Sequence, residues 1–211
     1  MADKEILIFV EGPSDKVFLE VYLYFLEDIP IKNFKVKDVT GKDNLSKRLL
    51  EIEKYDKTLI IFDADKDYES NKKEILSKTQ QKITEEQIFL FPNNQDDGDL
   101  ETLLLEIAKH DEFLKCFEGY LECIKSKEHY KPIKNISKSK WYAYLEVFEL
   151  QNFFKDKRNK NDKKNEEKII IDDKGKIRKE YKEEYEKLKE VIDFNSNSLI
   201  PLKDFLGQFA K

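Results

Sequence analysis

Two short, continuous apolar runs constrain the fold of this chain more than any other feature. They cover residues 6–10 and 59–62, and an acidic residue directly follows each of them, Glu11 after the first and Asp63 after the second. Such a run, rich in Ile, Leu and Phe, is typical of a β-strand that is covered on both faces, as in a parallel sheet. Because ligands bind outside the carboxyl ends of the strands in such sheets, we expect both carboxylates at one edge of one sheet.

A second aspartate lies close to the end of the later run. Asp63 and Asp65 are two residues apart, so in an extended backbone their side chains would point to the same side. Together with Glu11 they would form a set of three carboxylates that repel one another, for which a hard cation is the usual remedy. We therefore expect Mg²⁺, or Mn²⁺ in its place, at Glu11, Asp63 and Asp65. Asp67 follows in the same loop and is a further possible ligand.

Strand and helix patterns alternate over the first half of the chain. We expect strands at residues 5–11, 34–39, 58–62 and 87–91. We expect helices at residues 14–25, 45–52, 69–82 and 100–107, with Ser14 as the N-cap of the first. This alternation predicts an α/β fold, Rossmann-like in character, with a mainly parallel four-stranded sheet flanked by helices. The strand at 34–39 alternates apolar and polar residues, so we expect it near an edge.

The strand pattern stops after about residue 109. Helices are expected at residues 111–128, 138–154 and 178–192. We therefore divide the chain into a metal-binding core at 1–110 and a helical elaboration at 111–211 that packs on this core. The highly charged residues 155–168 are expected to be mobile, with a nucleic-acid-binding arm as the alternative. The aromatic residues Trp141, Tyr142 and Tyr144 are expected in the core, with stacking on single-stranded bases as the alternative.

Three short motifs occur in a specific order in the first half of the chain. Glu11-Gly12 ends the first strand and Ser14-Asp15 opens a helix, Asp63-Ala64-Asp65 ends a later strand, and residues 89–101 end in Asp99-Leu100-Glu101. The first two motifs resemble the Toprim domain, the metal-binding fold of topoisomerases, bacterial primases, small ribonucleases and OLD-type nucleases. The third resembles a small branch of stand-alone Toprim proteins. The resemblance covers roughly the first half of the chain and implies Mg²⁺-dependent chemistry on phosphodiester bonds.

The resemblance also implies roles for the acidic residues. Glu11 would act as a general acid or base and complete the metal site, whereas Asp63 and Asp65 would hold Mg²⁺. OLD-like nucleases use additional acids for a second metal, and two metals roughly 3.5–4 Å apart would stabilise both the attacking and the leaving oxygen. The candidates for this second set are Asp15, Asp99 and Glu101.

The acidic residues also have structural alternatives. Glu11 could be a strand-end acid that faces solvent, and Asp63 and Asp65 could simply form a turn. Asp15 and Glu101 can interact favourably with a helix dipole, and Asp99 can cap its helix. Gly12 would let a phosphate approach the backbone. Lys42 follows the second strand at the same end of the sheet, where it would either steer a phosphate or remain a solvated lysine of the turn.

Composition narrows the possible activities. The chain has only two histidines, and Cys116 and Cys123 do not form a zinc pattern, which leaves carboxylates as the natural metal ligands. Primases and recombination mediators of the Toprim class carry zinc modules, and topoisomerases need a further tyrosine-bearing domain for which this chain is too short. The net charge of −5 gives no overall attraction to nucleic acid, so any contact must come from a local patch or through a metal.

We therefore expect a Mg²⁺-dependent nuclease that acts on DNA or RNA. The main alternative is a non-catalytic module that binds Mg²⁺ and a nucleotide or nucleic acid for a partner protein such as an ATPase. A receiver-like phospho-acceptor domain fits poorly, because its acid pair follows the first strand and not the third. With a mean hydropathy of −0.72 and no apolar run near the ~20 residues that span a bilayer, we expect a cytoplasmic protein without membrane contact.

Overall fold

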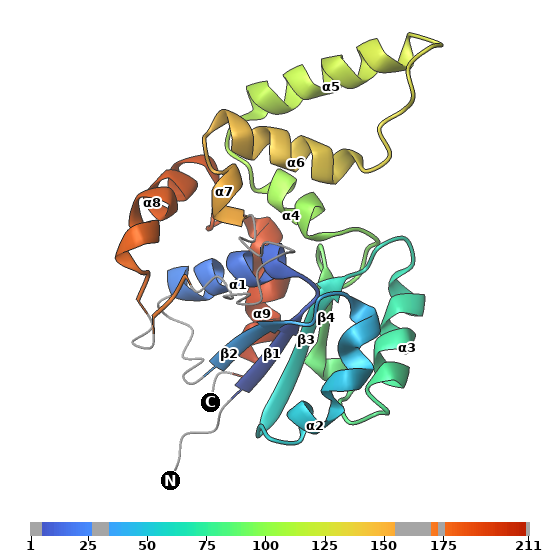
Figure 1. The fold of residues 1–211 in the computed structure, drawn as a ribbon, viewed down its shortest axis with the longest axis vertical. Helices are drawn as coiled ribbons and strands as arrows, with labels where there is room; N and C mark the ends of the chain where they lie inside the picture. Colours follow the sequence, from blue (N-terminus) through green and yellow to red (C-terminus); the bar gives the residue numbers. More distant parts are fainter. Residues whose placement is uncertain (1–5, 27–33, 155–169, 173–175, 210–211) are drawn as a thin grey trace, which may run out of the picture.

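A four-stranded sheet forms the centre of the protein (Figure 1). The structure is a computed structural model that describes residues 6–26, 34–154, 170–172 and 176–209. The strands are β1 (Ile6–Val10), β2 (Phe34–Asp38), β3 (Lys57–Asp63) and β4 (Ile88–Phe91). They lie in the order β2-β1-β3-β4 and every neighbouring pair is parallel. The expected α/β fold is confirmed, and β2 is at an edge as its alternating pattern predicted.

The helices lie close to the expected positions. They are α1 (Pro13–Phe25), α2 (Leu49–Ile52), α3 (Tyr68–Lys78), α4 (Leu100–Glu106), α5 (Asp111–Lys125), α6 (Ile136–Val147), α7 (Gln151–Phe154), α8 (Lys182–Val191) and α9 (Ile200–Gly207). A 3₁₀-helix, η1 (Lys42–Arg48), precedes α2. No helix in the described ranges combines the length and the apolar character needed to cross a bilayer.

Several predicted helix boundaries are wrong. Residues 45–48 belong to η1, the helix expected at 111–128 ends at Lys125, and the helix expected at 178–192 begins at Lys182. Three further boundaries differ for a local backbone reason. Gly12, and not Ser14, is the N-cap of α1, because Pro13 suits the first helical position, where its missing N–H costs nothing. The helix expected to reach residue 82 ends at Lys78, since Gln80 and Gln81 have positive φ angles. The helix expected at 138–154 is divided into α6 and α7 by Glu149, which also has a positive φ.

Both faces of the sheet are covered, which explains the unbroken apolar runs. On one face, side chains such as Ile8 and Val10 join a cluster with α1 and with the helices of the C-terminal half. On the other face, Leu7 and Phe9 join a second cluster with η1, α2 and α3. Alternate residues of one strand thus enter two different cores, so every residue of the strand is apolar.

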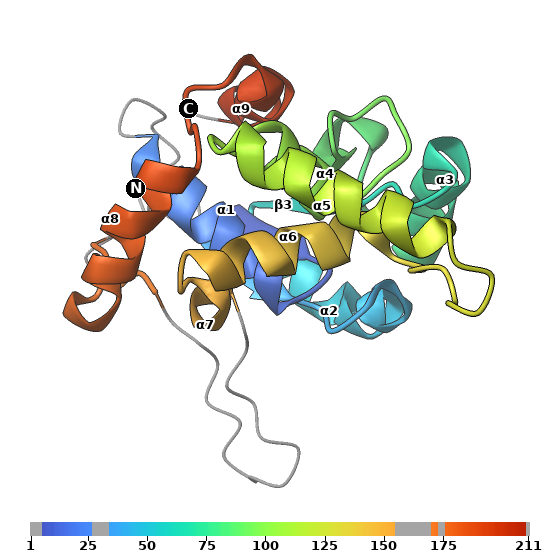
Figure 2. The ribbon, with the colours of Figure 1, turned by 90° about the horizontal axis from the view of Figure 1, so that it is seen from above.

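The C-terminal half completes the first of these two cores. Every residue of α1 from 15 to 23 is buried, because the sheet lies on one side of this helix while α7 and α8 lie beyond it (Figures 1 and 2). Trp141 of α6 and Phe205 of α9 belong to the same apolar cluster, and the Phe205 ring lies 5.4 Å from the ring of Phe89 in β4. The cluster therefore contains residues from both 1–110 and 111–211.

Helix α5 differs from the other long helices because none of its residues is buried. It lies against α6 and away from the sheet, so α5 and α6 form an arm that extends from the body of the protein (Figure 1). The loop at residues 126–135 joins the two helices at the end of this arm. Residues 155–168, for which mobility was predicted, lie outside the described residues.

Replacing Phe205 by Ala tests whether α9 is an integral part of the main core. The Phe205 side chain is buried against Phe89, so its truncation is expected to lower the free energy of unfolding by about 3–4 kcal/mol. Urea denaturation measures this loss, and Leu50→Ala is the control, because Leu50 is 74 % exposed. Equal stability of the two variants would show that α9 does not contribute to the core.

Candidate carboxylate site

The acidic residues that follow the strands meet the starts of two helices at the carboxyl edge of the sheet. Glu11 directly follows β1, and Asp63 is the last residue of β3. The register that pairs Val10 with Ile61 brings these two acids to neighbouring positions on adjacent strands. Asp15 enters from the first turn of α1, and Glu101 enters from the first turn of α4. We call the set Glu11, Asp15, Asp63 and Glu101 the carboxylate cluster.

Asp15 is almost completely buried in this cluster. One carboxylate oxygen accepts a hydrogen bond of 2.7 Å from the backbone N–H of Gly12. Burial raises the pKa of Asp15 to about 7, and the charges of Glu101 and Glu11 act in the same direction, whereas the Gly12 N–H opposes the shift. Asp15 is therefore a carboxyl group that can gain or lose a proton near neutral pH.

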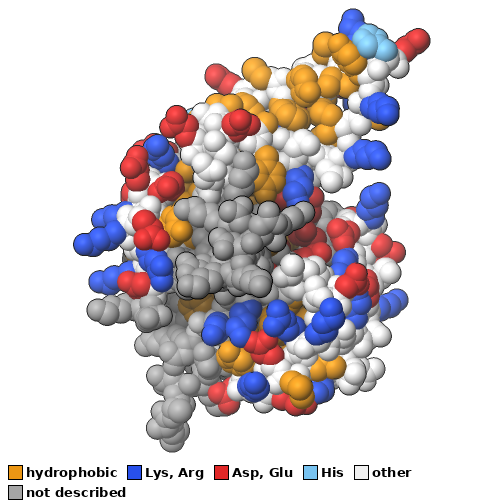
Figure 3. All heavy atoms as spheres, in the orientation of Figure 1, with side chains coloured by type: hydrophobic (Ala, Val, Ile, Leu, Met, Phe, Trp, Pro, Cys, Tyr) orange, Lys and Arg blue, Asp and Glu red, His pale blue; other side chains and the backbone are white. Residues whose placement is uncertain are grey.

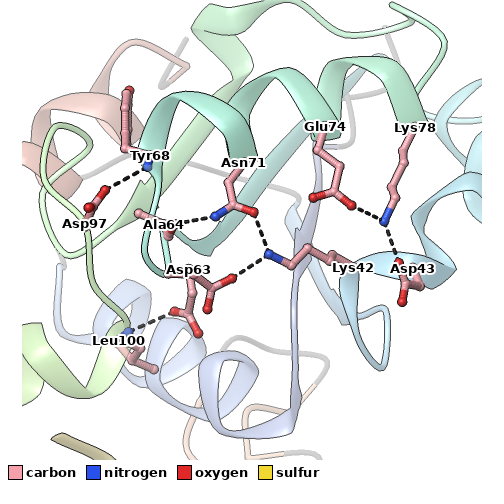
Figure 4. A network of polar contacts seen from close by, with 11 residues as sticks. Lys42, Asp43, Asp63, Ala64, Tyr68, Asn71, Glu74, Lys78, Asp97 and Leu100 are labelled. Atoms are coloured by element: carbon pink, nitrogen blue, oxygen red, sulfur yellow. Dashed lines mark hydrogen bonds and ion pairs between the residues drawn. The ribbon is translucent and has the colours of Figure 1, made fainter.

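Asp63 connects the sheet to helix α4. Its Oδ1 atom accepts a hydrogen bond of 2.9 Å from the backbone N–H of Leu100, the first residue of that helix (Figure 4). Burial raises the pKa of Asp63 well above its ordinary value, and the nearby charges of Asp15, Glu11 and Glu101 raise it further against the effect of the Leu100 N–H. Burial and the neighbouring acids therefore disfavour the charged form of the Asp63 carboxyl group.

One carboxylate oxygen of Glu11 is buried and has no hydrogen-bond partner among the described residues. This oxygen is the Oε2 atom. Burial raises the pKa of the Glu11 carboxyl group, although the charge of Lys42 acts in the opposite direction. Native proteins rarely leave such an atom unsatisfied, so an oxygen of this kind marks a place where a cation or water fits.

Asp65 is oriented differently from the prediction. The strand ends at Asp63, and Asp65 has a left-handed backbone with φ 55°, so the expectation of parallel side chains in an extended backbone is wrong. The Asp65 N–H donates a hydrogen bond of 2.7 Å to the carbonyl oxygen of Gly98, which fixes this conformation. The Asp65 side chain is half exposed and lies at the mouth of the cluster.

Lys42 pairs with Asp65 at this mouth. Its Nζ atom lies 2.5 Å from Asp65 Oδ2. The same atom lies 2.6 Å from Asn71 Oδ1 (Figure 4). Asn71 in turn donates to the carbonyl oxygen of Ala64, so α3 supports the loop that holds Asp65. Partial burial lowers the pKa of Lys42, but the hydrogen bond and charge of Asp65 outweigh it and the pKa is raised. Lys42 therefore brings a positive charge to the acidic loops.

Two further acids act as helix caps in this structure. The Asp99 side chain accepts hydrogen bonds from the Thr102 N–H at 2.8 Å and from Ser137 Oγ at 2.9 Å, so it caps α4 and ties α4 to α6. Asp67 accepts from the Ser70 N–H and caps α3. Asp99 thus follows its structural alternative, and Asp67, expected as a possible further ligand, caps α3 in the same way. Such caps satisfy N–H groups that have no partner inside the helix.

Gly12 and Gly98 shape the cluster through the backbone. Gly12 has an extended conformation that any residue adopts, and its N–H already binds Asp15, so this amide is not open to a phosphate. Gly98 has φ 147°, and a Cβ atom there would lie 3.0 Å from Pro92. Glycine is therefore required at 98, where the carbonyl oxygen holds Asp65.

Glu101 contacts a lysine that the sequence pattern did not single out. It is buried, which raises the pKa of its carboxyl group, and the Nζ atom of Lys138 in α6 lies 3.9 Å from its Oε1 atom and opposes this shift. Lys138 is far from the motifs along the chain. Only its place in a lysine-rich stretch could have drawn attention to it.

The carboxylate cluster has the donor chemistry that a hard cation requires. Its side chains all end in carboxylate oxygens, the preferred partners of Mg²⁺, and Glu11 Oε2 has no hydrogen-bond partner among the described residues. Within the described ranges, no three His, Cys, Asp or Glu side chains are already close enough to enclose an ion. The residues therefore fit Mg²⁺ by the chemistry of their donor oxygens.

Replacing Asp15 by Asn is expected to stabilise the protein in a pH-dependent way. The pKa of Asp15 is higher in the folded state than in the unfolded state, so its favourable contribution is present below about pH 4 and is lost as the pH rises through about 7. In EDTA the variant should gain about 2–4 kcal/mol at pH 8 and much less at pH 5.

Urea unfolding at pH 5 and pH 8 measures this difference. Asp43→Asn is the control, because the pKa of the exposed Asp43 carboxyl is lowered by Lys78 and its charge is constant over this range. An equal gain for Asp15→Asn at both pH values would contradict the assignment of a buried, proton-binding Asp15.

Comparison with known proteins adds a family to this geometry. No curated protein and no solved structure matches the chain. A family model described as "Protein of unknown function (DUF3226)" matches residues 5–210. This description names no activity, so the Toprim resemblance stays a prediction. Because the match covers nearly the whole sequence, the chain belongs to the DUF3226 family.

Proposed function

We propose that this protein hydrolyses phosphodiester bonds of nucleic acid with the help of Mg²⁺ bound at the carboxylate cluster. The observation that carries the proposal is that Glu11, Asp15, Asp63 and Glu101 meet at the carboxyl edge of a parallel sheet, where Asp15 and Glu101 are buried and Glu11 and Asp63 are partly buried. Four carboxyl groups that are shielded from water in one place repel one another, and a divalent cation offsets this repulsion. Ligands also bind at this edge in open parallel sheets.

We assign the residues of the cluster different roles according to their positions. Glu11 and Asp63 end adjacent strands and would hold the ion, with Asp15 as a third ligand. When bound, Mg²⁺ would polarise the phosphate and lower the pKa of a water molecule. Burial raises the pKa of the Glu11 carboxyl group, which favours proton exchange, so Glu11 would take a proton from water or give one to the leaving oxygen.

Lys42 and Asp65 form the entrance to this site. Lys42 forms an ion pair with Asp65, and its positive charge also lowers the pKa of Glu11. A phosphate that approaches the cluster would meet Lys42 before it meets the buried acids. Lys42 can therefore exchange Asp65 for a phosphate oxygen, which leaves Asp65 free to turn toward the cation.

A nuclease assay tests the proposal directly. Purified protein is incubated with labelled single- and double-stranded DNA and RNA in Mg²⁺ or Mn²⁺, next to Glu11→Gln and Asp63→Asn. The wild type should cleave, and each variant should be slower by about 10²–10⁴-fold, because each removes a ligand or a proton-transfer group. Asp96→Asn is the matched control, since Asp96 is an exposed acid of a nearby loop and lies outside the cluster.

Metal binding is measured separately from cleavage. Mg²⁺ should raise the melting temperature of the wild type and of Asp96→Asn, and it should have little effect on Asp63→Asn. Cleavage that persists in EDTA, or that Asp63→Asn retains, would overturn the proposal. Binding of Mg²⁺ and nucleic acid without any cleavage would replace it with the non-catalytic module that serves a partner protein.

A further inference from the structure

The end of the α5–α6 arm carries a concentration of positive charge. Residues 125–140 contain six lysines and a single acidic residue, Glu128, in a chain whose net charge is −5. Most of this stretch belongs to the exposed loop between α5 and α6. In the space-filling view, lysine side chains lie along the arm near its tip and beside the body (Figure 3). This part of the surface therefore differs in sign from the protein as a whole.

Four of the six lysines are available to an anionic ligand. Lys125 pairs with Glu122 at 3.0 Å and Lys140 pairs with Glu118 at 2.8 Å, so the arm neutralises these two itself. The available lysines are Lys127, Lys131, Lys134 and Lys138. The first three make no ion pair within the described ranges, and their side chains are exposed to solvent. Lys138 is more than half exposed and faces Glu101 at 3.9 Å.

The lysine-rich loop leads directly to the carboxylate cluster. Helix α6 begins where the loop ends, and its first turn contacts the start of α4: Ser137 Oγ donates to Asp99, and Lys138 lies beside Glu101. The exposed lysines at 127, 131, 134 and 138 are spaced every three or four residues up to that contact. A flexible polyanion that lies along the loop would therefore reach the buried acids with its backbone paired to lysines.

An exposed aromatic ring lies among these lysines. The Tyr130 ring is 4.3 Å from the His129 ring, and Tyr130 is 52 % exposed. Base stacking was the alternative for Trp141, Tyr142 and Tyr144. Trp141 and Tyr144 are buried in the core and cannot stack on a base, and Tyr142 is partly buried against this core with its hydroxyl 3.1 Å from Ser14 Oγ. Tyr120 of α5 is exposed to the same extent, but Tyr130 is the tyrosine of the loop at residues 126–135 and lies among its lysines. An exposed ring flanked by lysines is the arrangement that binds unpaired bases without regard to sequence.

We propose that residues 126–138 bind a single strand of nucleic acid and guide it to the carboxylate cluster. Lys127, Lys131, Lys134 and Lys138 contact phosphates along the strand, and Tyr130 stacks on an unpaired base. The stretch contains no arginine, so it lacks the bidentate group that most often reads guanine, and binding does not depend on sequence. This inference rests on the proposed function, from which it takes nucleic acid as the substrate, and it adds that the substrate is single-stranded.

Binding is measured in EDTA, so that the measurement does not depend on cleavage. The probes are fluorescein-labelled 20-nucleotide oligothymidine and oligouridine and a 20-base-pair DNA duplex, and the readout is fluorescence anisotropy. The variant K127Q/K131Q/K134Q should bind both single strands at least 10-fold more weakly at low salt. Its plot of log affinity against log salt should also be shallower by about 2, because each phosphate contact on a single strand contributes about 0.7 to the slope.

A second triple variant controls for the change in net charge. K35Q/K54Q/K203Q removes three exposed lysines from β2, from the loop after α2 and from α9, and it should bind within twofold of the wild type. Equal weakening of binding in the two triple variants would overturn the proposal, because the loss of affinity would then follow from the change in net charge and not from the loop. A loop variant that binds like the wild type would overturn it as well.

Tyr130 distinguishes a single strand from a duplex. Tyr130→Leu should weaken single-strand binding by about 5- to 100-fold, the range expected for one lost base–aromatic stack. Tyr130→Phe keeps the ring and should bind within twofold of the wild type. Wild-type binding that is equally tight for duplex and single strand, or Tyr130→Leu binding that is unchanged, would overturn the single-strand assignment. Comparison of oligothymidine with oligouridine shows whether the strand is DNA or RNA.

Hydrolysis of a small diester separates this inference from the proposed function. The loop variant retains Lys138 and the carboxylate cluster, so it should hydrolyse bis(p-nitrophenyl) phosphate as fast as the wild type while it cleaves oligonucleotides more slowly. If the wild type hydrolyses neither substrate, the proposed function fails and the anisotropy data still decide the role of the loop. If the loop variant cleaves oligonucleotides as fast as the wild type, only the loop inference fails.

Discussion

The burial of several carboxyl groups in one place is the constraint on which the rest of the structure depends. Removing an ionised carboxylate from water costs several kcal/mol unless hydrogen bonds or a cation compensate. Two helix starts supply part of this compensation, since the Gly12 N–H binds Asp15 and the Leu100 N–H binds Asp63. The apolar packing around the strands offsets the remaining desolvation free energy. This packing keeps the acids together, whereas acids on an exposed surface loop could move apart.

The helical half of the chain is part of this arrangement and does more than cover the sheet. Helix α4 provides the Leu100 N–H for Asp63 and carries Glu101, and Asp99 at its start is tied to Ser137 of α6. Lys138, one residue further along, faces Glu101. The position of the carboxylate cluster is thus set by contacts between the two halves. A change in how α6 packs would alter the charge around Glu101 as well as the core.

The sequence revealed the parts of this site that depend on local pattern. A short, continuous apolar run that is rich in β-branched and aromatic residues predicts a strand that is covered on both faces. The positions of Glu11 and Asp63 at the ends of two such strands were therefore predictable. Glu101 and Lys138 meet only through the packing of α4 against α6, for which no short pattern exists. Asp65 was misjudged because its left-handed backbone depends on Gly98, a residue 33 positions further along the chain that has its own steric reason to be glycine.

The separation of charge resolves an apparent conflict between an acidic protein and a polyanionic substrate. Charges more than about 8–10 Å apart are largely screened at physiological salt, so a ligand senses the local patch and not the net charge. Lys127, Lys131 and Lys134 lie on a loop at the end of an arm. In the cluster, Asp15 and Glu101 are buried, and Glu11 and Asp63 are partly buried at the edge of the sheet. A strand bound along the loop would first gain favourable contacts with lysines. It would then meet the acids only near Lys138, Lys42 and a bound cation. These positive charges offset the repulsion between the phosphates and the acids at the place where hydrolysis is proposed.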